Sequence, residues 1–214
     1  MSKPSVPPAA SLAGDAAGIE ILSRREVYRG RATVEEVTLR QRRRDGGHQE
    51  ITREIVRYGR NVVAVLPLDL ERGCLLLCRQ LRVPMLVDQG DPRPFEVCAG
   101  RLEEGEDAAD GARRELLEEF GVAALSLTPV MVCYTSPGIL GARADLFLAG
   151  YDGAARAAGG GLLAEGEDIE VLEVGFAEAA RLLAEGRLRD AKSVILLQHL
   201  MLRHPDRFGP LAGP

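Results

Sequence analysis

The chain is poor in aromatic residues and has no long hydrophobic run. It contains no tryptophan, aromatic residues make up 4% of its 214 positions, and its mean hydropathy is −0.04. No apolar stretch approaches the roughly 18 residues of a membrane-spanning helix, and residues 1–8 show no apolar run of the kind found in signal peptides. We therefore expect a cytoplasmic protein with no membrane partner.

Cysteine is scarce, and positive charge is not in excess. The cysteines lie in apolar segments without C-x-x-C spacing, a pattern that favours reduced core thiols over disulfides or zinc ligands. With 27 basic and 32 acidic residues the formal net charge is −5, which argues against nucleic acid or an anionic membrane as main partner. The four thiols belong to Cys74, Cys78, Cys98 and Cys133.

Composition divides the chain into four parts. Residues 1–17 are rich in Pro, Ala, Ser and Gly and are predicted to be a disordered tail. Residues 18–58 form an N-terminal region in which strand-like alternation on both sides of the turn Arg44-Asp45-Gly46-Gly47 predicts a long antiparallel β-hairpin. Something must cover the apolar face of such a hairpin. The remaining parts are a main domain over 59–204 and a C-terminal tail over 205–214.

Hydrophobic periodicity in the main domain predicts both strands and helices. Continuous apolar runs bounded by turn residues indicate buried strands, and a period of 3.6 indicates helices. Strands on either side of a central helix, with helices closing the chain, are typical of a layered α/β sandwich. A glycine-rich stretch at 153–161 is interpreted as a flexible loop. The expected strands are 61–70, 74–78, 125–134, 143–151 and 169–174, and the expected helices are 107–120, 176–185 and 191–203.

Three carboxylates crowd one face of the helix expected over 107–120. Glu115, Glu118 and Glu119 stand in an i, i+3, i+4 relation, which places them on one side of a helix. Carboxylates this close repel one another unless a cation neutralises them, and hard oxygen donors suit Mg²⁺ or Mn²⁺. The other interpretation of this spacing is the solvated face of an amphipathic helix.

Residues around this cluster have physical roles of their own. Asp107 or a neighbour is expected to cap the helix N-terminus, and Gly121 to close its C-terminus. Gly100 would let the chain turn after an apolar run and leave carbonyls free to face a cation. Arg114 either orients a carboxylate or is a solvated helix arginine. The spaced positions are, in order, Gly100, Glu106, Arg114, Glu115, Glu118, Glu119 and Gly121.

These positions match the complete signature of the Nudix hydrolases, which the chain resembles over residues 20–203. The resemblance implies the Nudix fold, an α/β/α sandwich with a mixed sheet, preceded here by the N-terminal antiparallel hairpin. It also implies hydrolysis of a nucleoside diphosphate linked to another group, by divalent metals that bridge the diphosphate and position a water. In sugar-nucleotide branches of this family the hairpin commonly serves dimer formation and reaches the partner's active site, so a homodimer is expected.

Segments outside the signature resemble one branch of the family. Residues 79–83, 95–100 and 134–138 together resemble the ADP-ribose and GDP-mannose pyrophosphatases. The substrate implied is a nucleoside diphosphate sugar. Three later segments look most like the GDP-mannose branch, namely 159–161, 165–173 and 186–193.

The resemblance also carries site residues over by position. It implies metals on the carbonyl of Ala99 and on the carboxylates of Glu115, Glu119 and Glu167. Glu118 would join them or orient water, so Glu115, Glu118 and Glu119 are the expected catalytic residues. Glu167 comes from a distant loop and is otherwise a solvated acid. The matching substrate-binding positions, whose basic members suit diphosphate oxygens but are also common on surfaces, are Tyr28 for base stacking and Arg53, Glu54, Arg82, Arg101 and Lys192.

One position departs from this branch. A glutamate usually stands four residues after Ser136-Pro137-Gly138, and here that position is Ala142, whose methyl group cannot accept a proton. Either a relocated acid assists the water, or hydrolysis is slow, or the substrate differs. A bound cation already lowers the pKa of its water, which favours a relocated base. The candidates are Asp145, Glu118, Glu167 and Glu170.

Three functions follow from this sequence. The first is Mg²⁺-dependent hydrolysis of GDP-mannose to GMP and mannose 1-phosphate. The second is the same chemistry on ADP-ribose, which would give AMP and ribose 5-phosphate. The third is a non-catalytic sugar-nucleotide binding module that lost a base at Ala142, although such a module has no need for Glu115, Glu118 and Glu119 together.

Overall fold

The computed structural model describes residues 18–155, 157, 159–161, 166 and 168–209. The tail predicted over 1–17 lies outside the described residues. Two compact units make up the described chain, and each is treated by itself. The N-terminal unit ends at Arg60 and includes the loop Tyr134–Arg143, whereas the main unit comprises Asn61–Cys133 and the residues from Ala144 onward.

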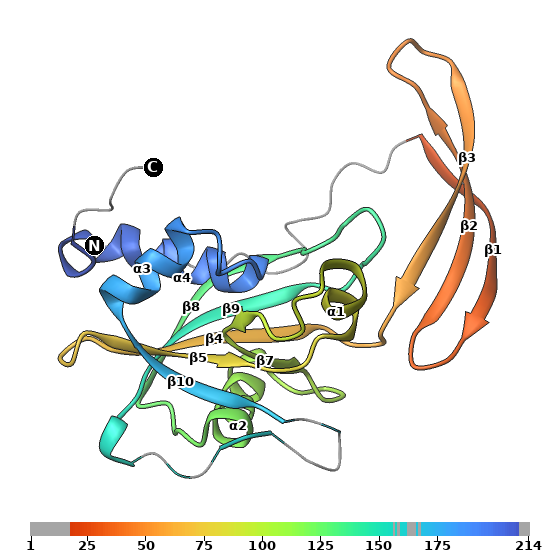
Figure 1. The fold of residues 1–214 in the computed structure, drawn as a ribbon. Coiled ribbons are helices and arrows are strands. Elements are labelled where there is room, and N and C mark those ends of the chain that lie inside the picture. Colours follow the sequence, from red (N-terminus) through yellow and green to blue (C-terminus); the bar gives the residue numbers. More distant parts are fainter. Residues whose placement is uncertain (1–17, 156, 158, 162–165, 167, 210–214) are drawn as a thin grey trace. The chain divides into compact units, whose positions relative to one another are not determined.

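The N-terminal unit is a three-stranded antiparallel sheet. Its strands are β1 (Ile19–Arg29), β2 (Thr33–Arg42) and β3 (His48–Arg57), paired in the order β1-β2-β3 (Figure 1). The predicted hairpin corresponds to β2 and β3, but β1 was not expected. All 11 residues of β1 are exposed, so its sequence carries no burial-driven alternation by which a strand is recognised.

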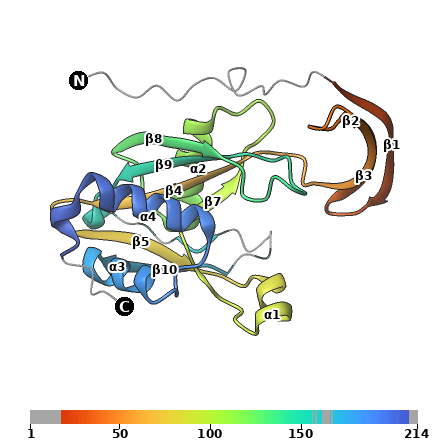
Figure 2. The ribbon, with the colours of Figure 1, turned by 90° about the horizontal axis from the view of Figure 1, so that it is seen from above.

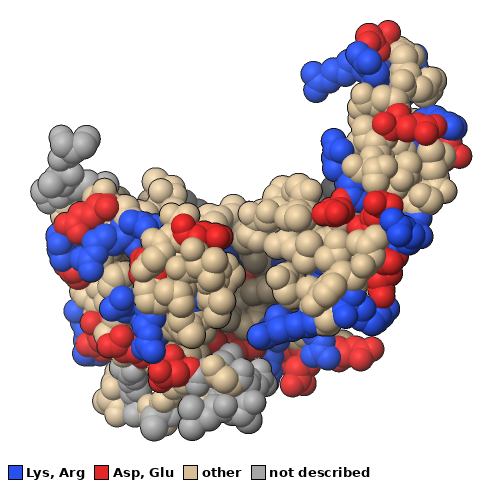
Figure 3. Space-filling model, turned by 45° about the vertical axis from the view of Figure 1, so that its right-hand side comes forward, with Lys and Arg blue, Asp and Glu red and all other residues tan. Residues whose placement is uncertain are grey.

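Charged side chains pair across this sheet. Glu35 of β2 lies 2.6 Å from Arg24 of β1 and 2.9 Å from Arg57 of β3. Basic and acidic side chains are interspersed on the face drawn in Figure 3. Exposed ion pairs are screened by solvent and stabilise a fold only weakly, so they favour this register without replacing a core. Val37 is the one buried apolar residue among the described residues of this unit.

The main unit has one mixed sheet with helices on both faces. Its bounds are β4 Val62–Asp69, β5 Cys74–Arg79, α1 Val83–Gln89, β6 Phe95–Glu96, β7 Cys98–Arg101, α2 Ala108–Phe120, β8 Ser126–Cys133, β9 Ala144–Gly150, η2 Gly153–Ala155, β10 Glu170–Gly175, α3 Phe176–Ala184, α4 Ala191–Arg203 and η4 Pro205–Arg207. The strand order is β10-β5-β4-β9-β8, with β6 paired to β5 and β7 to β4, and only β4 and β9 are parallel. Helix α2 covers one face and α3 and α4 the other (Figure 1). The predicted α/β/α sandwich is confirmed.

Alternate residues of β4 pack against the two helical layers. Val63 belongs to a buried cluster with Leu116 and Phe120 of α2, whereas Ala64 and Leu66 belong to the cluster formed with α3 and α4. Successive side chains of a strand point to opposite faces, so β4 links both cores. Seen from above, α4 crosses β4 and β9 (Figure 2). No helix in the described part of the chain combines the length and apolar content needed to cross a membrane.

Two further segments differ from expectation. Helix α1 was not predicted because it buries none of its residues; Pro84 stands in its first turn, and Gly90 ends it with a φ of 70°. Residues 205–208 were assigned to a tail, but η4 forms over Pro205–Arg207 and Phe208, which follows it, is buried. Its ring stacks on that of Phe176 with centroids 4.9 Å apart, so the segment that follows α4 packs against α3.

The glycine-rich stretch at 153–161, interpreted from its composition as a flexible loop, is held against the end of α2 in its described residues. The N–H of Gly160 donates to the carbonyl of Glu119 at 2.8 Å. A Cβ on Gly159 would lie 2.5 Å from the carbonyl carbon of Phe120, so only glycine allows the two backbones to approach this closely.

Candidate active site

Helix α2 forms where the sequence predicts it, because both of its ends are capped locally. The Asp107 side chain accepts a hydrogen bond from the N–H of Ala109 at 2.8 Å, and Gly121 ends the helix in the left-handed conformation with a φ of 66°. Leu116 and Phe120 are fully buried against the sheet. This packing sets the rotation of the helix and therefore the direction of its three glutamates.

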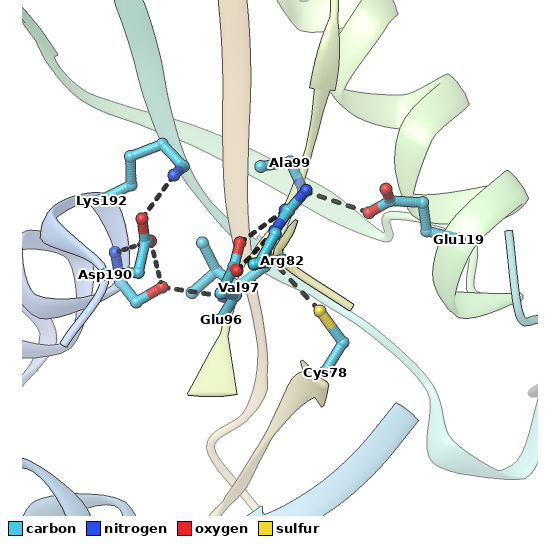
Figure 4. A network of polar contacts seen from close by, with 9 residues as sticks. Cys78, Arg82, Glu96, Val97, Ala99, Glu119, Asp190 and Lys192 are labelled. Atoms are coloured by element: carbon cyan, nitrogen blue, oxygen red, sulfur yellow. Dashed lines mark hydrogen bonds and ion pairs between the residues drawn. The ribbon is translucent and has the colours of Figure 1, made fainter. Parts of the chain in front are cut away.

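Two of those glutamates are buried against β7. Glu115 is 8% exposed and Glu119 is 3% exposed, and the Glu119 carboxylate accepts a hydrogen bond from the N–H of Ala99 at 3.1 Å (Figure 4). Gly100 continues the strand and does not turn it, which corrects the role expected for it. A Cβ there would lie 1.9 Å from the Glu115 carboxyl carbon, so glycine is required for this carboxylate to lie against the backbone.

The carbonyl of Ala99 lies on the same edge of β7 as Glu119. Ala99 is paired with Ala64 of β4, yet its N–H points to Glu119, which places its hydrogen-bonding groups on the side away from β4. The N–H and C=O of one strand residue point the same way, so this carbonyl also faces the open edge. A carbonyl and two carboxylates are thereby gathered where α2 meets β7.

Arg114 is hydrogen-bonded to the carboxylates of this cluster, as expected if it orients them, and is not a solvated helix arginine. It binds both carboxylate oxygens of Glu106, at 2.9 and 3.0 Å, and donates to Glu115 at 2.9 Å and Glu118 at 3.0 Å. Its remaining bond, at 3.0 Å, goes to the carbonyl of Arg101. The hydrogen bonds to Glu106 are the main reason why the pKa of Arg114 is raised, so the guanidinium stays charged.

The donors fit a hard divalent cation. Carboxylate and carbonyl oxygens are the ligands of Mg²⁺ and Mn²⁺. In this cluster the single guanidinium of Arg114 faces three carboxylates, those of Glu106, Glu115 and Glu118. The thiol of Cys98 is not a competing ligand, because burial first and then Glu119 raise its pKa well above the usual value. Glu167 lies outside the described residues, and among the described ones no three Asp, Glu, His or Cys side chains already converge as a metal site.

Arg82, predicted to bind diphosphate, is held by Glu96. Its Nε and one terminal nitrogen donate to the two Glu96 oxygens at 2.7 and 2.6 Å (Figure 4). Glu96 is 4% exposed, and its hydrogen bonds raise the pKa of Arg82 although burial opposes them. Sequence reasoning missed Glu96, although an acid inside the apolar run Phe95-Glu96-Val97 is a signal for a buried, paired carboxylate.

Lys192 is paired in a similar way at the start of α4. Its Nζ lies 2.6 Å from Asp190, whose carboxylate also caps the helix by accepting from the N–H of Ser193 at 3.0 Å. Burial by itself raises the pKa of Asp190, but the charge of Lys192 and the hydrogen bonds bring it below the usual value. Asp190 is therefore an anion that holds the Lys192 ammonium.

The other predicted substrate residues lie on different elements. Arg101 ends β7, next to the α2 cluster, and is exposed. Arg53 and Glu54 lie on β3, and Tyr28 lies on β1, all in the N-terminal unit. Of the candidate bases, Glu118 is partly exposed and Asp145 is buried on β9.

The chain is similar in sequence to proteins named GDP-mannose pyrophosphatase and ADP-ribose pyrophosphatase. The chain is 42% identical over 162 residues to a GDP-mannose pyrophosphatase of Cronobacter sakazakii, covering 75% of this chain and 83% of that protein. It is 35% identical over 187 residues to an ADP-ribose pyrophosphatase of Escherichia coli K12, covering 87% and 89%. A GDP-mannose pyrophosphatase of Pectobacterium atrosepticum is 35% identical over 163 residues, covering 76% and 83%.

A solved structure shares the fold. It is described as the crystal structure of an ADP compounds hydrolase and superposes with a TM-score of 0.69 at 22% identity, covering 91% of this chain and all of that one. The model of the NUDIX domain matches residues 57–197, which include α2 and every described member of its cluster. The chain belongs to the NUDIX family.

Proposed function

We propose that this protein is a Mg²⁺-dependent pyrophosphohydrolase that cleaves GDP-mannose with water to GMP and mannose 1-phosphate. The observation that carries the proposal is the gathering of Glu115, Glu119 and the Ala99 carbonyl at one edge of β7. The 42% identity to a protein named GDP-mannose pyrophosphatase supports the choice of substrate.

The residues that would hold Mg²⁺, or Mn²⁺ in its place, are Ala99, Glu115, Glu118, Glu119 and Glu167. When bound, the metal would neutralise the diphosphate and lower the pKa of a water. Arg114 keeps the carboxylates oriented through its fixed fork of donors. Arg53, Arg82, Arg101 and Lys192 would bind diphosphate oxygens, Tyr28 would stack on the base, and Glu54 is a further substrate-binding position.

Ala142 leaves the proton acceptor to be assigned. We assign it to Glu118, which is the most exposed of the three glutamates of α2 and is held 3.0 Å from Arg114. A positioned, water-accessible carboxylate is suited to orienting the attacking water and taking its proton. Asp145 is buried on β9 and fits this role less well.

ADP-ribose is the second candidate substrate. The relative from Escherichia coli K12 is named an ADP-ribose pyrophosphatase and matches a larger share of this chain, 87%. A non-catalytic binding module is disfavoured, because burying two carboxylates without a metal to bind would cost stability for no function. Separate steady-state assays on GDP-mannose and ADP-ribose with Mg²⁺ decide between the substrates: a higher kcat/KM for ADP-ribose would overturn the first choice.

We also propose that the protein works as a cytoplasmic homodimer. The N-terminal sheet exposes Ile19, Ile21 and Tyr28 on β1 and buries little of its own, which supports its being covered by a second copy. Three buried free cysteines suit a reducing compartment. Light scattering tests the assembly, and a monomer at micromolar concentration would contradict it.

A further inference from the structure

Ser193 of α4 links two parts of the candidate site. The residue is fully buried, and its hydroxyl accepts a hydrogen bond from the N–H of Val97 at 2.9 Å while donating to Asp190 at 2.6 Å. Val97 lies between β6 and β7, 96 residues away in sequence. Figure 4 shows the line of contacts that runs from Lys192 through Asp190 to Val97.

The direction of these bonds follows from charge. Asp190 is an anion that only accepts, since its pKa is depressed, so the Ser193 proton points to it. The oxygen lone pairs then face Val97, whose carbonyl on the other side lies 3.9 Å from the Cys78 thiol. Val97 is 1% exposed, so water does not replace Ser193 as the acceptor for its N–H.

The segment held in this way carries two groups of the site. Glu96, one residue before Val97, forms the paired contact with Arg82. Ala99, two residues after it, meets Glu119 and offers its carbonyl to the edge of β7. A strand advances about 3.3 Å per residue, so a displacement at Val97 is passed on directly to both neighbours.

We propose that Ser193 is a positioning residue, which fixes residues 96–99 to the start of α4 and so sets the Ala99 carbonyl and the Glu96–Arg82 pair relative to Lys192. This inference rests on the proposed function of the site. It differs from a purely structural role, because Ser193 would govern metal affinity and turnover beyond its effect on folding.

The test compares Ser193→Ala with two other variants in direct Mn²⁺ titration by calorimetry. Ser193→Ala keeps the helix cap, which uses the backbone N–H, and removes the acceptor for Val97 together with the hydroxyl's own hydrogen bond to Asp190. Ser193→Thr retains the hydroxyl. Leu200→Ala truncates another fully buried residue of α4, about two helical turns beyond Ser193, and reports general destabilisation. Circular dichroism establishes the temperature at which all of them are folded.

We expect Ser193→Ala to bind Mn²⁺ roughly tenfold more weakly than the wild type. Its kcat should fall more than its KM changes, Ser193→Thr should restore most of the affinity, and Leu200→Ala should bind as the wild type does. Equal Mn²⁺ affinity in Ser193→Ala and wild type, equal weakening in Leu200→Ala, or no binding by the wild type would overturn the positioning role. If the affinities differ as expected but wild type releases no phosphomonoester from any sugar nucleotide, the proposed function fails and the positioning role stands.

Discussion

The backbone N–H of Ala99 donates to the Glu119 carboxylate at 3.1 Å, joining the edge of a strand to the last turn of a helix. The bond places a buried carboxylate and a carbonyl on the same side of β7, although 20 residues separate them. Gly100 then admits Glu115 to the same place.

Glu119→Gln should lower hydrolysis by orders of magnitude and leave the fold intact. The amide oxygen still accepts from Ala99, so packing is conserved, but the negative charge that would bind a metal is lost. Steady-state rates and the thermal midpoint measure the two effects separately. Activity equal to that of the wild type would show that Glu119 is not a metal ligand.

Glu118→Gln should reduce kcat by roughly 10²-fold or more, with a smaller change in KM, because the acceptor assigned to the water is removed. Rates measured over a range of Mg²⁺ concentrations distinguish loss of the proton acceptor from weaker metal binding. If saturating Mg²⁺ restores kcat, Glu118 is only a metal ligand, and the base must be another acid.

Gly100→Ala should abolish most activity at little cost in stability. The new methyl group would overlap the Glu115 carboxyl, which is the end of a flexible side chain and moves away with little strain. Gly175→Ala is the matched control, because a Cβ at the N-cap of α3 meets nothing within 4 Å. A fully active Gly100→Ala enzyme would mean that the position of Glu115 is unimportant.

Asp190 should stabilise the fold above about pH 4 and lose this contribution in acid. Its pKa in the folded protein lies below the usual 3.8, so the unfolded chain takes up a proton first as the pH falls. The difference in unfolding free energy between wild type and Asp190→Asn should therefore be constant near neutral pH and shrink below 3.8. Urea unfolding at several pH values measures it, and a difference that grows in acid would reverse the sign argued here.

Local features of the site could be predicted from sequence, and distant partnerships could not. The caps Asp107 and Gly121 and the spacing of the α2 glutamates all belong to one helix. The caps follow from the residue types at its two ends, and the shared face of the glutamates follows from the 3.6-residue period. The partner of Arg82 is 14 residues away, and that of Ser193 is 96 residues away. Such contacts depend on how the layers pack, and no periodicity reports them.

Burial explains the elements that were missed. β1 and α1 bury no residue, so they lack the hydrophobic pattern by which elements are recognised. Gly100 was expected to turn the chain, because glycine most often signals a turn. Its use for close approach of a side chain becomes visible only when Glu115 is seen beside it.

Metal-dependent hydrolysis of GDP-mannose can be measured as release of phosphomonoester by the purified protein before and after chelation of divalent metal. We expect equal amounts of GMP and mannose 1-phosphate with Mg²⁺, loss of both on chelation, and recovery when Mg²⁺ or Mn²⁺ is returned. Cleavage that continues undiminished under full chelation, or no cleavage of any nucleoside diphosphate sugar at high enzyme concentration, would contradict this expectation.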